Sequence, residues 1–129
     1  SGAEAVVEGC GSNGCEYMTG GTVAILGPVG DNFAAGMTGG MAFIHDSDGS
    51  FERRVNPETV IWQRLESPYW TDVLKALIRR HAEATHSAFA ERLLIDWQLE
   101  AGSFWQVVPK EILNKLPQPL SAEPAELRA

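Results

Sequence analysis

A tetrapeptide that occurs twice, Met-Thr-Gly-Gly, constrains the fold of this chain more than any other feature of its sequence. The stretch "MTGGTVAILGPVG" at 18–30 aligns with "MTGGMAFIHDSDG" at 37–49 at an offset of 19 residues. Twelve of the 13 glycines lie in residues 1–50, where they separate short β-branched runs. Glycine-bounded runs of about five residues predict strands rather than helices, which need about 10 residues or more. The first half therefore predicts a stack of short strands joined by glycine turns.

The length of the repeat predicts how those strands are arranged. About 20 residues is the length of one solenoid coil, and stacked coils pair their strands in parallel around an apolar interior. We therefore expect a mainly β fold, namely a single-stranded, glycine-cornered parallel β-helix followed by an α-helical segment. Glycine suits the corners because it tolerates positive φ. The predicted structural corners are Gly9, Gly11, Gly14, Gly20, Gly21, Gly27, Gly30, Gly36, Gly39, Gly40 and Gly49.

The second half of the chain has a helical pattern. Ser67-Pro68 predicts a helix start, because serine caps helix N-termini and proline is favoured at the first helical position. Ser87 predicts the cap of a second helix, and "FWQVVP" at 104–109 predicts a terminal strand. All four tryptophans lie in this half and are interpreted as core residues or as a docking surface for a partner: Trp62, Trp70, Trp97 and Trp105.

These patterns divide the chain into segments. We expect β-helix coils over 1–55 and helices with a terminal strand over 56–113, together forming one domain over 1–113. The stretch 114–129 is rich in proline and poor in large apolar residues. Such composition predicts a flexible C-terminal tail.

The glycines invite a second interpretation, because Gly9-x-Gly11-x-x-Gly14 spells the dinucleotide-binding fingerprint. That fingerprint needs a helix that opens at its third glycine, whose N-terminal N–H groups hold the pyrophosphate. Paired glycines and a β-branched run follow instead, so we expect these glycines to hold no phosphate. A stand-alone small-molecule or nucleotide-binding module that uses the glycine-rich loops is the alternative function.

Further candidates for metal binding or catalysis also favour structural roles. Asp46 and Asp48 have no EF-hand spacing, and we expect them to satisfy the backbone of a turn in which Gly49 takes positive φ. His81 and His86 are five residues apart, which does not place both on one metal-binding helix face, and we expect them near a helix C-terminus.

Three glutamates and both cysteines lie in the first 20 residues. Glu4, Glu8 and Glu16 show no acid–base pairing that the sequence defends. Cys10 and Cys15 have no zinc-ligand spacing, and we interpret them as reduced thiols, with a disulfide between them as the open alternative. We therefore assign no catalytic, cofactor-binding or metal-binding residue.

Charge and hydropathy exclude two classes of partner. The chain carries 17 acidic and 10 basic residues, a formal net charge of −7. Nucleic-acid binders usually show a basic excess, so nucleic acid is not an expected partner. No apolar run approaches the roughly 20 residues that a membrane span needs, so we expect no membrane association.

The chain resembles a known family through one long stretch, "EGCGSNGCEYMTGGTVAILGPVGDNFAAGMTGGMAFIHD". The similarity continues through "VNPE", "LIRRH", "AERLLIDW" and "FWQVVPKE", and covers about residues 3–113. These motifs resemble the GXGXG domain at the C-terminus of the glutamate synthase large (alpha) subunit. The chain begins without methionine, which fits an excised domain, although a separately encoded domain fits as well.

The resemblance implies a fold and a role. Glutamate synthase forms two L-glutamate from L-glutamine and 2-oxoglutarate with electrons from NADPH, NADH or ferredoxin, and is cytoplasmic, or plastid in photosynthetic eukaryotes. In that family this domain is a right-handed β-helix with a structural role, bracing the glutaminase domain and the FMN synthase domain around an ammonia channel. FMN and an iron–sulfur cluster belong to the parent enzyme, and no motif for either occurs in this chain. The resemblance therefore implies a non-catalytic domain without a cofactor of its own.

The expected partners follow from the same resemblance. They are the glutaminase and FMN synthase domains of the parent chain, and the reductase subunit is a further candidate. A solenoid cut open exposes an unpaired end, so we also expect self-association of the chain.

Overall fold

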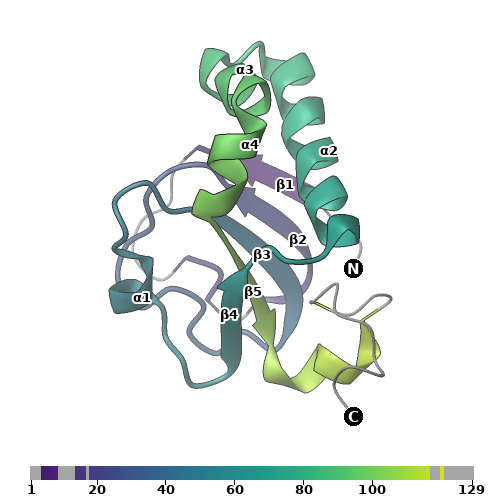
Figure 1. Ribbon diagram of the computed structural model, residues 1–129. Coiled ribbons are helices and arrows are strands. Elements are labelled where there is room, and N and C mark those ends of the chain that lie inside the picture. The colour runs from purple at the N-terminus through teal and green to yellow at the C-terminus, as the bar shows by residue number, and fades with distance from the viewer. Residues whose placement is uncertain (1–3, 9–13, 17, 117–119, 121–129) are drawn as a thin grey trace.

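The computed structural model describes residues 4–8, 14–16, 18–116 and 120. It is an α/β structure in which helices cover one face of a five-stranded open sheet (Figure 1). The elements follow in the order β1 (Glu4–Val7), β2 (Thr19–Ile25), β3 (Gly39–His45), α1 (Phe51–Arg54), β4 (Val60–Arg64), α2 (Pro68–Thr85), α3 (Ala88–Ile95), α4 (Trp97–Glu100), the 3₁₀ helix η1 (Ala101–Ser103), β5 (Phe104–Pro109) and the 3₁₀ helix η2 (Lys110–Lys115).

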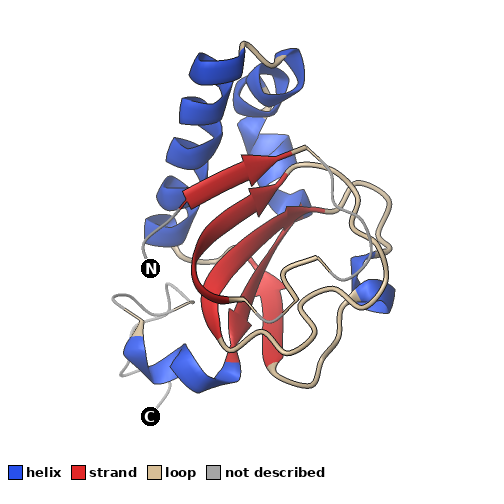
Figure 2. Cartoon of the chain, turned by 180° about the vertical axis from the view of Figure 1, so that it is seen from behind, coloured by secondary structure: helices blue, strands red, loops and turns tan. Residues whose placement is uncertain are grey.

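The sheet is mixed, with strand order β1-β2-β3-β5-β4 (Figure 2). Strands β1, β2 and β3 pair in parallel, whereas β5 is antiparallel to both of its neighbours, β3 and β4. The sequence repeat coincides with the β2–β3 pair. Thr22 pairs with Met41 and Ile25 with Ile44, which is the same 19-residue offset. The parallel pairing of the repeated segments is therefore confirmed.

The predicted β-helix is wrong. A solenoid would continue beyond β3 with another parallel strand, but β5 occupies that edge in the antiparallel direction. A β-helix also needs further strands between the stacked ones, and the described residues between β2 and β3 contribute one isolated bridge, Phe33 to Val55. The fold is consequently α/β and not mainly β.

The predicted starts of the two helices in the second half are confirmed. Ser67 is the N-cap of α2, with Pro68 at its first turn. Ser87 is the N-cap of α3, and its hydroxyl oxygen accepts a hydrogen bond from the Ala90 N–H at 3.1 Å. The terminal strand at 104–109 is confirmed as β5.

Strand β4 was not predicted from the sequence. Val60, Ile61 and Trp62 are β-branched or aromatic residues of the kind that favours strands, and they were the available signal. The apolar run has only three residues and is followed by Gln63 and Arg64, which is too short for the alternation that identifies a half-buried strand.

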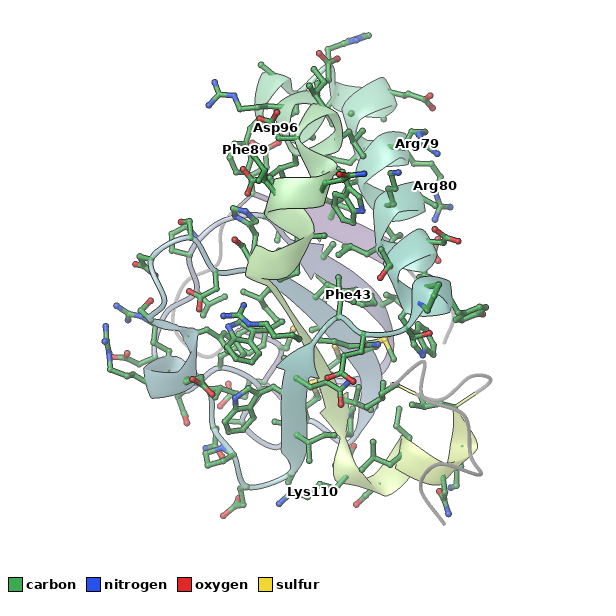
Figure 3. All side chains as sticks on the ribbon, viewed as in Figure 1. Phe43, Arg79, Arg80, Phe89, Asp96 and Lys110 are labelled. Atoms are coloured by element: carbon green, nitrogen blue, oxygen red, sulfur yellow. The ribbon has the colours of Figure 1, made fainter. Side chains whose placement is uncertain are left out.

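Alternate residues of the central strands supply two hydrophobic cores, one on each face of the sheet. Met41 and Phe43 of β3 pack against helix residues such as Leu74, and Figure 3 shows Phe43 on the side of the sheet that α2 covers. Ala42 and Ile44 face the opposite core. That second core is built from loop and α1 residues, including Val29, Phe33, Met37, Phe51 and Val55.

The second core explains how long loops lie on a sheet without a helical layer. The Phe33 N–H donates to the Arg54 carbonyl at 2.8 Å, and the Asn56 N–H donates to the Phe33 carbonyl at 2.7 Å. The Phe33 ring meets the Phe51 ring edge-on at 5.7 Å. These contacts fasten the loop before β3 to the segment after it.

Within the described residues, no helix combines the length and the hydropathy that crossing a bilayer requires.

Candidate functional site at the carboxyl ends of the parallel strands

The carboxyl ends of the three parallel strands β1, β2 and β3 lie on the same side of the sheet. Ligands of open α/β sheets usually bind at these strand ends. Glu8 directly follows β1, Leu26 follows β2, and His45 ends β3. A cavity of about 350 Å³ lies at these strand ends. Its lining comprises Glu8, Leu26, Gly27, Pro28, His45, Ser47 and Phe89.

Glu8 joins the sheet to the corner between α2 and α3. The Ser87 hydroxyl donates to Glu8 Oε2 at 2.5 Å. His81 Nε2 hydrogen-bonds the same oxygen at 2.9 Å, with the ring N–H as donor because a carboxylate only accepts. These two hydrogen bonds, first that from Ser87 and then that from His81, lower the pKa of Glu8 from its ordinary value of 4.5. The carboxylate thus holds together three segments that are distant in the sequence.

His45 makes a second connection between the sheet and the helices. Its side chain is buried, and Nε2 lies 2.8 Å from Glu100 Oε1 at the end of α4. The imidazole meets the Phe104 ring edge-on at 5.0 Å and the Phe89 ring at 6.0 Å. His45 is therefore fixed between β5, α3 and α4 at the wall of the cavity.

The turn after β3 has the structure that the sequence predicts. Oδ1 of Asp46 and Oδ1 of Asp48 accept hydrogen bonds from the Ser50 N–H at 3.1 and 3.0 Å, and Gly49 has φ of +74°. The Ser50 hydroxyl also donates to Asp48, and both Ser50 bonds lower the pKa of Asp48. Asp46 additionally accepts a hydrogen bond from Trp105 Nε1 at 2.9 Å. The prediction that these aspartates satisfy turn backbone is confirmed.

Four of the predicted corner glycines lie inside strands. Gly20 and Gly21 belong to β2, and Gly39 and Gly40 belong to β3. Gly21 and Gly40 have φ of +84° and +82°, so the left-handed backbone repeats in neighbouring strands. The register of the β2–β3 pair also shifts here, between Thr19 and Thr22.

The two copies of the tetrapeptide contact each other through backbone atoms. The N–H groups of Thr38 and Gly39 both donate to the Met18 carbonyl, at 2.9 and 3.2 Å. A Cβ on Gly39 would overlap the Thr19 carbonyl group, so the close approach of the two strands here requires glycine at position 39.

The other predicted corners are distributed over the loops. Gly9 and Gly11, like Cys10, lie outside the described residues. The Gly14 carbonyl accepts a hydrogen bond from the Ala34 N–H at 2.7 Å. The next named element after Gly14 is strand β2, in the place where the dinucleotide fingerprint needs a helix. The remaining predicted corners are Gly27 at the cavity, Gly30 and Gly36 in the loop before β3, and Gly49.

Sequence reasoning missed the partners of Glu8. His81 and Ser87 lie 73 and 79 residues away along the chain. No local pattern connects residues at such separations, and Glu8 was set aside for lack of a partner. Within the described part of the chain, no group of three or more His, Cys, Asp or Glu side chains is placed to hold a metal ion.

Comparison with known protein families gives a match over most of the chain. A family model described as "GXGXG motif" matches residues 1–110, which include all five strands and the corner that Glu8 holds. The chain belongs to the GXGXG family.

The GXGXG chain is also homologous to glutamate synthases. It is 60% identical over 120 residues to the glutamate synthase [NADPH] large chain of Azospirillum brasilense, covering 93% of this chain and 8% of that protein. It is 52% identical over 107 residues to the chloroplastic ferredoxin-dependent glutamate synthase of Spinacia oleracea, covering 83% and 7%. The large chain of Bacillus subtilis is 46% identical over 117 residues, covering 90% and 8%.

These relatives are much longer than the GXGXG chain. It spans less than a tenth of the length of the curated relatives that it matches. The resemblance predicted from the glycine motifs is confirmed, as is homology to NADPH-dependent and ferredoxin-dependent oxidoreductases.

Proposed function

We propose that this chain is a non-catalytic structural domain of a glutamate synthase large chain. In this proposal it braces the glutaminase domain and the FMN synthase domain, which together form two L-glutamate from L-glutamine and 2-oxoglutarate with a reduced electron donor. FMN and the iron–sulfur cluster are held elsewhere in that parent protein. The domain occupies residues 1–113, and 114–129 form a tail.

One observation carries the proposal: the polar side chains at the carboxyl ends of the parallel strands are hydrogen-bonded to residues of the helices. Glu8 is bonded to Ser87 and His81, and His45 is bonded to Glu100. Each of these bonds connects a strand end to a helix. A general acid or base must reach a substrate atom in its reactive geometry, whereas these groups are engaged in joining elements. The arrangement supports a rigid scaffold rather than a reaction centre.

The proposed role predicts a measurable defect in the parent enzyme. Gly40→Ala in the intact large chain should weaken the sheet locally, with Gly49→Ala as the matched control. We expect glutamine hydrolysis to change by less than about twofold, while glutamate formed from 2-oxoglutarate per glutamine hydrolysed falls, because ammonia is lost between the active sites. An unchanged yield in Gly40→Ala protein whose domain has become protease-sensitive would contradict the bracing role.

Further partners belong to the same proposal. They are the reductase subunit and a second copy of the chain, which would meet at the edge strand β1 because its outer side has no neighbouring strand in the described sheet. Sedimentation that detects monomer alone at micromolar concentration would exclude self-association. Like its parent enzyme, the domain would work in the cytoplasm, or in a plastid of a photosynthetic eukaryote.

The 350 Å³ cavity favours a second candidate function, a small-molecule or nucleotide-binding module. The cavity lies at the carboxyl ends of parallel strands and borders Glu8, which precedes the glycine-rich loop. Titration of the chain with NADPH, FMN and ATP separates the two functions. Saturable binding at micromolar concentration would favour this second function over the structural one.

A further inference from the structure

Helices α2, α3 and α4 carry a groove that the structural role described above does not use. One hollow of about 450 Å³ lies between Arg79 of α2 and Leu94 of α3. A second, of about 440 Å³, lies between Lys75 of α2 and Ile95. Lys75 and Arg79 are one turn apart, so the two hollows follow each other along α2, the first against α3 and the second against Ile95 and α4. Figure 3 shows Arg79 and Asp96 on these two sides of the helical layer.

Two large aliphatic side chains project from the groove into solvent. Ile95 is 82% exposed and Leu99 is 81% exposed, whereas Leu93 of the same helix is buried in the core. Asp96 separates α3 from α4 with a non-helical backbone, and its carbonyl accepts a hydrogen bond from the Leu99 N–H at 2.9 Å. Ile95 and Leu99 are neighbours because both line the second hollow. Exposed apolar neighbours of this size mark interaction surfaces, since their burial is favourable.

The groove carries charges of both signs, because Lys75 and Arg79 line it together with the acidic residues Glu83, Glu91 and Asp96. Lys75 Nζ lies 5.9 Å from the centre of the Trp97 ring, between the two helices. Among the described residues, Lys75 and Arg79 form no salt bridge. The groove therefore offers apolar contacts at Ile95 and Leu99 in a mixed-charge setting, where Lys75 and Arg79 can each pair with a carboxylate of a partner.

We infer that the surface formed by Lys75, Arg79, Ile95, Trp97 and Leu99, here called the α2–α4 groove, docks against a segment of the glutamate synthase large chain outside residues 1–129. The segment presents apolar side chains to Ile95 and Leu99 and a carboxylate to Lys75 or Arg79. This inference rests on the proposed function.

The relatives favour this occupant over a second copy of the chain. The matched stretch is 8% of the Azospirillum protein and 7% of the spinach protein, so most of each relative lies outside it. A segment of the same polypeptide is present at high effective concentration because it is tethered. A second copy has no such advantage, and its docking would depend on protein concentration.

Hydroxyl-radical footprinting of the intact large chain tests the docking directly. Leu99 and Leu113 have the same intrinsic reactivity but are 81% and 37% exposed in this chain. If the α2–α4 groove is open to solvent, Leu99 is oxidised about twice as fast as Leu113. If the groove is covered, Leu99 is oxidised more slowly than Leu113 and at least fivefold more slowly than in the urea-unfolded large chain. The open-surface order would overturn the inference.

Lysine acylation in variants of the intact large chain provides a second measurement. We expect the Ile95→Ser/Leu99→Ser variant to increase the acylation rate of Lys75 several-fold, because the covering segment is released. Leu113→Ser is the matched control and leaves Lys75 protected. Equal Lys75 reactivity in the wild type and both variants would overturn the inference.

Two controls identify other occupants. Protection of Leu99 that is lost on dilution would show that a second copy covers the groove. Protection that is lost on internal deletion of residues 117–129 would show that the chain's own C-terminal segment covers it. Either result overturns the docking to a segment outside the chain.

The outcome is separable from the bracing role. An exposed Leu99 combined with a lower glutamate yield in the Gly40→Ala enzyme overturns the docking surface and leaves the bracing role standing. A protected Leu99 combined with an unchanged yield supports the docking surface and overturns the bracing role.

Discussion

A Cβ placed on Gly40 would lie 2.8 Å from the carbonyl oxygen of Gly21, its counterpart in the other copy of the repeat. Gly40 also has φ of +82°, which disfavours residues with a side chain. The second copy of Met-Thr-Gly-Gly therefore fits against the first because Gly39 and Gly40 leave the space in which the backbone of residues 19–21 lies.

The first prediction concerns this contact. Gly40→Ala combines left-handed backbone with a clash against backbone atoms, and should lower the free energy of unfolding by about 3 kcal/mol. Gly49→Ala is the matched control, since Gly49 has φ of +74° but no atom within 4 Å of a Cβ. It should cost about 1 kcal/mol. Urea denaturation measures both, and equal losses would show that the clash adds nothing.

The second prediction is a pH dependence at Glu8. Its pKa is lowered in the folded chain by Ser87 and His81, so the unfolded chain binds more protons at acidic pH. The stability that Glu8 contributes is complete above its ordinary pKa of 4.5 and is lost as pH falls through the lowered folded value. Glu8→Gln should therefore be less stable than the wild type near pH 6, with the difference closing in acid.

Ser87→Ala provides the control for that dependence, because it removes the hydrogen bond that lowers the Glu8 pKa most. The Glu8 pKa should rise toward 4.5 in this variant. NMR titration of the side-chain carboxyl carbon follows it directly. A wild-type Glu8 that titrates at 4.5 or above would refute the proposed connection between β1 and the helices.

The third prediction concerns Gln106, which is fully buried on the helix-facing side of β5. Its Nε2 contacts Met41 Sδ at 3.2 Å, and its Oε1 has no hydrogen-bond partner among the described residues. A buried unsatisfied amide is costly, so Gln106→Leu should raise the free energy of unfolding by about 1 kcal/mol.

The partner of Gln106 across the strand pair is a natural control. Gln63 pairs with Gln106 in register, but its Nε2 donates to the Leu120 carbonyl at 3.2 Å. Gln63→Leu loses that bond and should bring no gain. Thermal unfolding of the two variants separates a specific effect at Gln106 from a general preference for leucine in the sheet.

The fourth prediction concerns Asp46, which accepts hydrogen bonds from Ser50, Phe51 and Trp105. Asp46→Ala should cost about 2 kcal/mol because it removes the acceptor of the Phe51 and Trp105 N–H groups, whereas the Ser50 N–H keeps its hydrogen bond to Asp48. It should also shift tryptophan emission, since Trp105 Nε1 loses its partner. Asp48 accepts no hydrogen bond from Trp105, so Asp48→Ala should leave the emission unchanged. Identical spectra for both variants would contradict the assignment.

Local sequence features predicted the elements whose structure is determined locally. The Met-Thr-Gly-Gly repeat predicted the parallel pairing of β2 with β3, and Ser87 predicted the start of α3. In both cases the residues that determine the structure are close in the sequence: Ser87 directly precedes α3, and the paired strands are one repeat apart.

Features that depend on distant residues were not accessible in this way. Whether another coil follows β3 is decided by β5, whose Val107 pairs with Ala42 from 65 residues away. The glycine pattern of the first half is compatible with either outcome, so the β-helix prediction failed at that point. The same limit applies to Glu8, since nothing near it in the sequence indicates that Ser87 and His81 are its partners.

The position of β5 between β3 and β4 has a consequence for synthesis of the chain. Until residue 109 has been made, one edge of β3 and one edge of β4 are both without their eventual neighbour. Exposed strand edges are templates for pairing with other molecules, and contacts of long sequence separation form slowly. A nascent chain stalled in α2 would therefore expose two strand edges that still lack β5, one on β3 and one on β4. We expect its solubility during translation to depend on chaperone protection until the last strand arrives.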